Sequence, residues 1–166
     1  MLQLSINYAV NIMETQSDFK ELLALLNANH VDYIIVGGYA LAYYGLPRFT
    51  GDLDLLVKPD TDNARGIIDA LSEFGFSSLG LTEDDFIQPE QVVQLGRPPV
   101  RIDFITSISG VTWDEAWDGR IEGSYGDIPV NYLGRDQFIA NKLATGRTRD
   151  LADVELLSEM IEAEDT

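Results

Sequence analysis

Two short apolar runs constrain the fold of this chain more than any other feature. The first run, Tyr33-Ile34-Ile35-Val36, has the length of a buried strand and stops at Gly37-Gly38. The second run opens with Asp52-Leu53-Asp54 and continues to Val57. Because side chains alternate between the faces of a strand, Asp52 and Asp54 must point the same way. Two neighbouring carboxylates repel each other, so this arrangement requires a cation or a proton to offset the charge.

The aspartates and the glycines together indicate chemistry on phosphates. Hard cations such as magnesium take carboxylate oxygens as ligands, and backbone amides where a strand passes into a helix can face a phosphate. Two simpler interpretations remain open, namely a solvated strand end for the aspartates and a tight turn for the glycines. The surrounding residues, Leu53 and Leu55 to Val57, favour a buried strand, in which uncompensated acids are costly. The segment therefore predicts a metal-dependent phosphoryl or nucleotidyl transfer site.

A third acid, Asp103, is embedded in another expected strand, where apolar residues alternate over residues 100–105. A buried acid needs a partner. Two-metal phosphoryl transfer uses a further carboxylate on a neighbouring strand, and Asp103 would then also lie close enough to the attacking hydroxyl to act as general base. A salt bridge with Arg101 or Arg97 is the alternative.

The length and composition describe one globular domain. A chain of 166 residues can bury a real core but is too short for two ordinary domains. No apolar run approaches the roughly 20 residues of a membrane span, and the N-terminus lacks the pattern of a signal peptide. The chain has no cysteine and one histidine, His30, which excludes thiolate metal sites and leaves little scope for zinc chemistry. We therefore expect a cytoplasmic protein without a membrane partner.

The net charge of −17 argues against a surface that grips polynucleotides broadly, because such surfaces neutralise phosphates with basic residues. A free nucleoside triphosphate that carries its own magnesium suffers less from this field. The acidic excess serves either solubility or a basic protein partner, and composition leaves both open. Local positive potential can arise where the basic residues gather: Arg97, Arg101, Arg135, Lys142, Arg147 and Arg149.

The pattern predicts a single domain over residues 17–166, after an N-terminal arm over residues 1–16 that is either loose or an oligomer contact. Helices are expected over residues 17–30, 38–44, 61–75, 113–117, 134–145 and 148–162, and strands over 33–36, 53–57, 91–95, 100–105 and 128–133. Helices interleaved with strands, some of which are joined as hairpins, indicate an α/β or α+β fold with a mixed sheet.

The motifs resemble the polymerase-beta-like nucleotidyltransferase superfamily. Gly37-Gly38, a spacer of 13 residues (Tyr39 to Gly51) and Asp52-x-Asp54 match its signature. The segment Gly45-Leu46-Pro47-Arg48-Phe49-Thr50 is similar to the Gly-x-x-Arg-x-Thr of one subgroup, which contains small uncharacterised nucleotidyltransferases and the AbiE-type toxins of abortive-infection and toxin–antitoxin systems. The C-terminal Lys/Arg-Asp motif of that subgroup resembles Asn141-Lys142-Leu143 through Arg147-x-Arg149-Asp150-x-x-Asp153. The resemblance covers roughly Val31 to Leu157.

The resemblance implies a minimal nucleotidyltransferase fold, with a mixed sheet flanked by helices and a C-terminal helical pair. It also implies magnesium-dependent transfer of a nucleoside monophosphate from a triphosphate such as ATP to an acceptor hydroxyl. Asp52, Asp54 and Asp103 would bind two magnesium ions, or manganese in their place, and Asp103 would correspond to the third aspartate of the family. Gly37 and Gly38 would hold the triphosphate.

The resemblance also assigns roles to Lys142 and Asp150. Lys142 would reach the β and γ phosphates and stabilise the departing pyrophosphate, and Asp150 would belong to the same nucleotide site. Their simpler alternatives are a solvated helical lysine and an acid that caps or pairs along the last helix. Arg48 either touches the triphosphate or pairs with a neighbouring aspartate, and Thr50 either hydrogen-bonds those carboxylates or is an ordinary strand residue.

The acceptor and the partners stay open at this level. An RNA or tRNA end, a protein hydroxyl or a small molecule could accept the nucleotide; the toxins favour RNA, whereas the charge argues mildly against it. Because no extra domain is seen to grip the acceptor, a partner such as an antitoxin, or a second subunit of a homo-oligomer, could hold it. Two rival functions are a catalytically idle fold that serves as an antitoxin or protein-binding module, and a metal-dependent phosphatase or nuclease. The presence of all three aspartates counts against the idle fold.

Overall fold

The computed structural model of the chain describes residues 16–46, 51–97 and 99–165, with side chains as far as residue 160. The expected N-terminal arm lies outside this range except for Gln16. Arg48 and Thr50 also lie outside the described residues.

The described residues form one six-stranded mixed sheet with the strand order β3-β4-β2-β1-β6-β5. The central strand β1 is antiparallel to β2 and parallel to β6, while β2 is parallel to β4. The two outer pairs, β3 with β4 and β5 with β6, are antiparallel hairpins. The strands are β1 (Tyr33–Val36), β2 (Asp52–Val57), β3 (Val92–Arg97), β4 (Val100–Ile105), β5 (Ile121–Tyr125) and β6 (Ile128–Tyr132).

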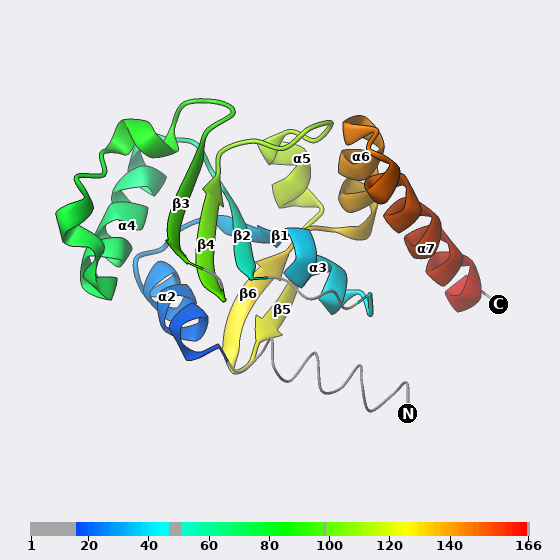
Figure 1. The fold of residues 1–166 in the computed structure, drawn as a ribbon, viewed down its shortest axis with the longest axis horizontal. Coiled ribbons are helices and arrows are strands. Elements are labelled where there is room, and N and C mark those ends of the chain that lie inside the picture. The colour runs from blue at the N-terminus through cyan, green and yellow to red at the C-terminus, as the bar shows by residue number, and fades with distance from the viewer. Residues whose placement is uncertain (1–15, 47–50, 98, 166) are drawn as a thin grey trace.

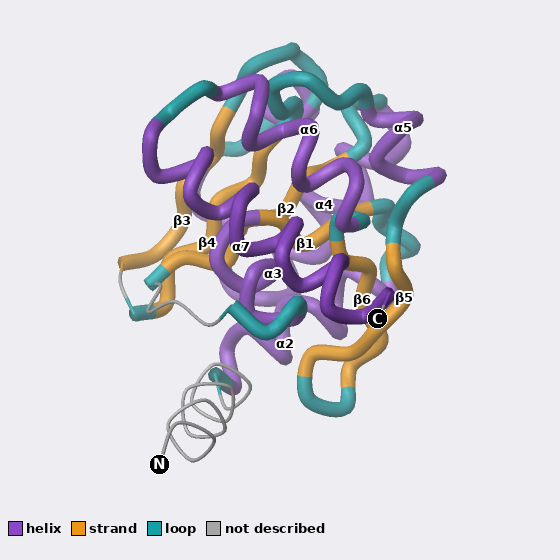
Figure 2. The backbone as a smooth tube through the Cα atoms, turned by 90° about the vertical axis from the view of Figure 1, so that its right-hand side faces the viewer, coloured by secondary structure: helices purple, strands orange, loops and turns teal. Residues whose placement is uncertain are grey.

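Helices cover both faces of the sheet (Figure 1). Helices α2 and α4 lie on one side, whereas α3, α6 and α7 lie on the other, as the rotated view also shows (Figure 2). Short helical turns at 72–76, 77–79 and 83–86 connect α4 to β3. The helices are α2 (Ser17–Ala28), α3 (Gly37–Tyr43), α4 (Thr61–Leu71), α5 (Trp113–Asp118), α6 (Arg135–Thr145) and α7 (Thr148–Asp165).

The apolar faces of α2 and α4 explain why β1 and β2 are rigid. All four residues of β1 are buried, because this strand has helices on both faces and a strand on either side. Each fully buried leucine or isoleucine stabilises the fold by about 1.5–3 kcal/mol relative to exposure. The helical residues that close this core are Phe19, Leu22, Leu23 and Leu26 from α2 and Ala64, Ile67, Ala70 and Leu71 from α4.

The expected mixed α+β fold is confirmed, and most elements fall within two residues of their predicted bounds. The prediction omitted β5, because Glu122, Gly123 and Ser124 interrupt its apolar alternation. Pairing with β6 decides its structure instead. Helix α4 is capped by Asp60, whose side chain accepts a hydrogen bond from the amide of Asn63, so the cap lies one residue before the predicted Thr61 or Asp62.

Within the part of the chain that is described, none of the helices has both the length and the apolar content that a membrane crossing requires.

Candidate active site

The register of two parallel strands brings the three predicted aspartates together. Strands β2 and β4 are neighbours, and their alignment places Asp54 opposite Asp103 and Asp52 opposite Arg101. Asp52 and Asp54 share a face because they are two residues apart. One carboxylate oxygen from each aspartate lies within 4.8 Å of the others. We call Asp52, Asp54 and Asp103 the carboxylate triad.

Gly37 lets the backbone approach this triad closely. The residue begins α3 directly after β1, and it has a positive φ of 70°. A Cβ atom at this position would collide with the carboxylate of Asp54. The glycine is therefore required both by its own conformation and by the aspartate packed against it. Its predicted role in phosphate binding remains a prediction.

Arg101 is a component of the site whose position sequence reasoning did not find. Its Nη2 donates to Oδ2 of Asp52 at 2.6 Å and to Oδ2 of Asp103 at 3.3 Å. Its Nε also lies 3.2 Å from Oδ1 of Asp103. The alternative considered for Asp103, a salt bridge with Arg101, is thus present together with the convergence of the triad. The sequence signal was the two-residue spacing from Asp103, but contact with Asp52 depends on the strand register.

A single guanidinium does not balance the three carboxylates. Burial, followed by the neighbouring charges of Asp103 and Asp52, raises the pKa of Asp54 to about 7, although Arg101 acts in the opposite direction. Asp103 is 6% exposed, and its Oδ1 has no hydrogen-bond partner among the described residues. A divalent cation fits this environment, because it would neutralise the crowded acids and occupy the buried oxygen.

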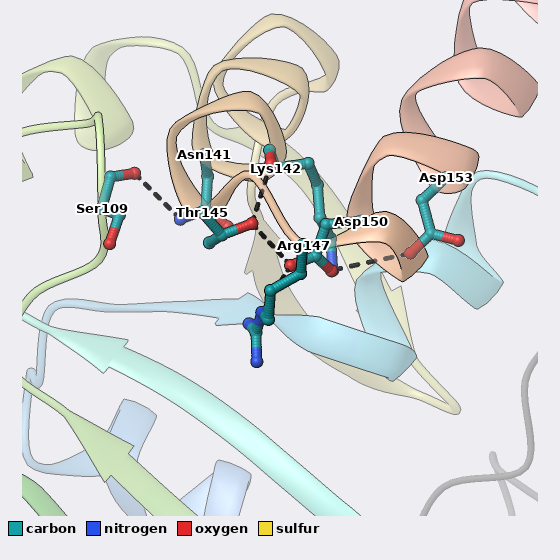
Figure 3. Close-up of polar contacts among 7 residues, drawn as sticks. All are labelled: Ser109, Asn141, Lys142, Thr145, Arg147, Asp150 and Asp153. Atoms are coloured by element: carbon teal, nitrogen blue, oxygen red, sulfur yellow. Dashed lines mark hydrogen bonds and ion pairs between the residues drawn. The ribbon is translucent and has the colours of Figure 1, made fainter.

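A second polar cluster joins α6 to α7 (Figure 3). Nζ of Lys142 lies 2.9 Å from Oδ1 of Asp150 and 3.6 Å from Oδ2 of Asp153. Thr145 Oγ1 and Arg147 Nε donate to the other oxygen of Asp150, at 2.6 and 2.9 Å. We call these five residues the helical cluster. Neither Thr145 nor the contact of Arg147 was expected from the sequence, although both residues lie within five positions of Lys142.

Asp150 differs from Asp54 in the sign of its pKa shift. Burial alone would raise the pKa of Asp150, which is 3% exposed. The hydrogen bonds from Thr145 and Lys142 outweigh burial, with a smaller contribution from Arg147, and they lower the pKa to about 2. The Asp150 carboxylate therefore has hydrogen-bond donors for both of its oxygens, and Lys142 is held in place rather than solvated.

The triad and the helical cluster face each other across a pocket of about 260 Å³. This pocket joins residues that are far apart in the sequence, and it includes most of the predicted site. Asp103 is buried behind the lining residues, and a larger hollow of about 720 Å³ beside Tyr43 and Tyr44 contains none of the predicted site residues. The pocket is lined by Gly37, Gly38, Leu41, Asp52, Asp54, Lys142, Arg147, Arg149, Asp150 and Asp153.

Comparison with known proteins identifies the family and supports the fold. The sequence profile of the family described as "Nucleotidyl transferase AbiEii toxin, Type IV TA system" matches residues 22–166. A solved structure from Thermotoga maritima, described as that of a candidate nucleotidyltransferase, is similar with a TM-score of 0.50. The two sequences are 14% identical, and the alignment covers 87% of this chain and 91% of that one, so this likeness supports the fold alone. No curated protein sequence is a significant match.

Proposed function

The chain belongs to the AbiEii family of nucleotidyltransferase toxins, and on this basis we propose that it transfers a nucleoside monophosphate from a nucleoside triphosphate to an acceptor hydroxyl. Nucleotidyl transfer is the activity of the family, while the cation, the site residues and the substrates are our assignment. The observation that carries the assignment is the pocket in which two aspartates of the triad, Asp52 and Asp54, meet the glycine pair and Lys142.

The triad is the metal site in this proposal. Asp52, Asp54 and Asp103 would hold two magnesium ions, or manganese, through oxygens that are close enough to share them. Bound there, the cations would polarise the α-phosphate and neutralise its charge. The oxygen of the acceptor hydroxyl forms a bond to the α-phosphorus, the bond to the bridging oxygen breaks, and pyrophosphate leaves with the electron pair. Asp103 takes the proton of the hydroxyl as general base.

The other pocket residues position the triphosphate. Gly37 packs against the carboxylate of Asp54, and both glycines line the pocket, where their backbone amides would face phosphate oxygens. Lys142 supplies positive charge to the departing pyrophosphate, and Asp150 holds the lysine in a fixed orientation. We retain Arg48 and Thr50 as predicted nucleotide contacts on the basis of the sequence motif alone.

The partners follow from the family and the charge. We propose an RNA end, such as that of tRNA, as acceptor, with a protein or a small molecule as the other substrates to be tested. The net charge of −17 makes unaided RNA binding weak, so a second subunit or a basic partner would assist it. A cognate antitoxin would oppose the activity in the cell. We propose that residues 17–166 act as one domain in the cytoplasm, where the absence of cysteine has no consequence for stability.

A labelling experiment tests the function. The purified protein is incubated with each α-labelled triphosphate, magnesium and total cell extract, and labelled RNA, protein and small molecules are separated. Label should enter one acceptor class with the wild type and with Asp69→Asn, which changes an exposed acid of α4, but not with Asp54→Ala. Equal labelling by Asp54→Ala would refute the assignment. Label transferred from the γ position would indicate a kinase, and RNA loss without any triphosphate would indicate a nuclease.

A further inference from the structure

We propose that Arg101 is an internal counterion which competes with divalent cations for Asp52 and Asp103, so that it sets the affinity of the site for metal. The inference rests on the metal site proposed above. It assigns to Arg101 a positioning role: the guanidinium holds the acids together until a cation replaces it.

The contacts of Arg101 place it where a metal ligand sphere would form. Both oxygens of Asp103 face the guanidinium, Oδ1 at 3.2 Å from Nε and Oδ2 at 3.3 Å from Nη2. The same Nη2 is 2.6 Å from Oδ2 of Asp52. A magnesium ion approaches its oxygens to about 2.0–2.1 Å and tolerates little distortion of its geometry. A cation that uses Asp103 must therefore share this carboxylate with a positive charge or displace it.

The strand register explains why Arg101, among the basic side chains of the described residues, contacts the triad. Arg101 lies directly opposite Asp52 and shares its face of β4 with Asp103, so it reaches two members of the triad. It lies opposite Gly96 of β3, where a Cβ atom would collide with the carbonyl of Val100. The tight hairpin that this glycine permits fixes the backbone of Arg101 beside the acids.

The side chain of Arg101 is partly exposed, so movement away from the acids would take its guanidinium toward solvent. It is 30% exposed, whereas the side chain of Asp103 is 9% exposed. Arginine remains charged at any ordinary pH, so it cannot lose its charge to make room for a second cation and must move instead. Displacing Arg101 therefore weakens metal binding, whereas its contacts with the acids stabilise the protein without metal.

A metal titration tests the inference without measuring turnover. Binding of Mn²⁺ to the metal-free protein is followed by the loss of the electron paramagnetic resonance signal of free Mn²⁺. The variants are Arg101→Gln, Arg101→Lys and the control Arg65→Gln, which removes a surface cation of α4 whose side chain is 62% exposed. Arg101→Gln should bind Mn²⁺ about tenfold more tightly than the wild type, within the range that coupling between sites usually spans. Arg65→Gln should match the wild type.

Thermal unfolding provides the second readout. Without metal, Arg101→Gln should unfold at a lower temperature than the wild type, and saturating Mn²⁺ should stabilise it more than it stabilises the wild type. Arg101→Lys keeps the charge without the planar guanidinium, so its Mn²⁺ affinity should lie between those of the wild type and Arg101→Gln. This variant replaces Arg101→Gln in the test if the latter does not fold.

The outcomes separate this inference from the proposed function. If the wild type binds Mn²⁺ and Arg101→Gln binds it equally or more weakly, Arg101 does not compete and the inference is wrong, although the metal site stands. If neither protein binds Mn²⁺ at millimolar concentration, the metal site itself is refuted.

Discussion

The triad on the sheet and the helical cluster of α6 and α7 face the same pocket, but their charges are balanced differently. Asp54 is surrounded by other acids, and its pKa is raised to about 7. Asp150 receives hydrogen bonds from three side chains, and its pKa is lowered to about 2. The charge of Asp150 in the helical cluster is balanced within the protein, whereas the triad gains from an added cation. We infer that the helical cluster is a scaffold for Lys142. The triad is instead held in an arrangement that destabilises the protein and serves function.

The largest expected effect is a loss of activity when the triad is changed. Its absence would contradict the distinction between the triad and the helical cluster. Asp54→Asn keeps the size of the side chain but removes a metal ligand. We expect nucleotidyl transfer to fall about 10³-fold or more, because metal stabilisation of transition-state charge is worth several kcal/mol. The rate of incorporation of α-labelled nucleotide measures it, with Asp69→Asn as control. A loss below about tenfold, the equivalent of 1.36 kcal/mol, would mean that Asp54 is not a ligand.

The helical cluster should instead lose stability. Asp150→Ala leaves Lys142 and Thr145 without their shared acceptor in a buried place, so we expect the free energy of unfolding to fall by about 2–3 kcal/mol at pH 7. Urea denaturation followed by circular dichroism measures this change. The difference in stability between the wild type and Asp150→Ala should disappear as the pH falls from about 4 through about 2. Over this range Asp150 becomes protonated, first in the unfolded chain and then in the folded protein, and the contribution of the ionised carboxylate is lost. A variant as stable as the wild type at pH 7 would remove the distinction between the two groups.

The pH dependence of the metal-free protein sharpens the comparison. Asp54 has an ordinary pKa of 3.8 when unfolded and about 7 when folded, so between these values the folded protein holds a proton that the unfolded chain has lost. Stability should therefore decrease as the pH rises from about 4 to 7, by about 3 kcal/mol. Urea denaturation in a chelator at several pH values measures it. In Asp54→Asn this decrease should be absent, so that the variant is the more stable protein at pH 8.

The smallest effect concerns one hydroxyl of the helical cluster, which contacts both Asp150 and the carbonyl of Lys142. Thr145→Val removes the hydroxyl that donates to Asp150 at 2.6 Å and preserves the branched shape. We expect a loss of about 1 kcal/mol in the free energy of unfolding, and Thr61→Val, at an exposed position of α4, should lose less. The pKa of Asp150, followed by NMR, should rise at the same time. An unchanged pKa would show that Lys142 and Arg147 are sufficient alone.

The sequence predicted individual residues of the site but not the contacts between residues that are far apart in the chain. The spacing of Asp52 and Asp54 required a common face, because the strand period is a local property. The glycine pair was found because it ends the apolar run of the first strand, and the structure shows that Gly37, with a φ of 70° and Asp54 packed against it, must be glycine. Arg101 was considered only as a partner of Asp103. Its stronger contact, with Asp52, joins residues 49 positions apart and requires the parallel register of β2 and β4.

The order of the residues thus determined which helices form, which strands form apart from β5, and which acids share a strand face, because these follow from periodicity and from the steric limits of glycine. Tertiary structure alone decided that Asp150 is satisfied while Asp54 is not, and that Arg101 spans two acids. These properties depend on the groups that burial and sheet register bring within about 3 Å, and electrostatic and hydrogen-bond energies change steeply over that distance.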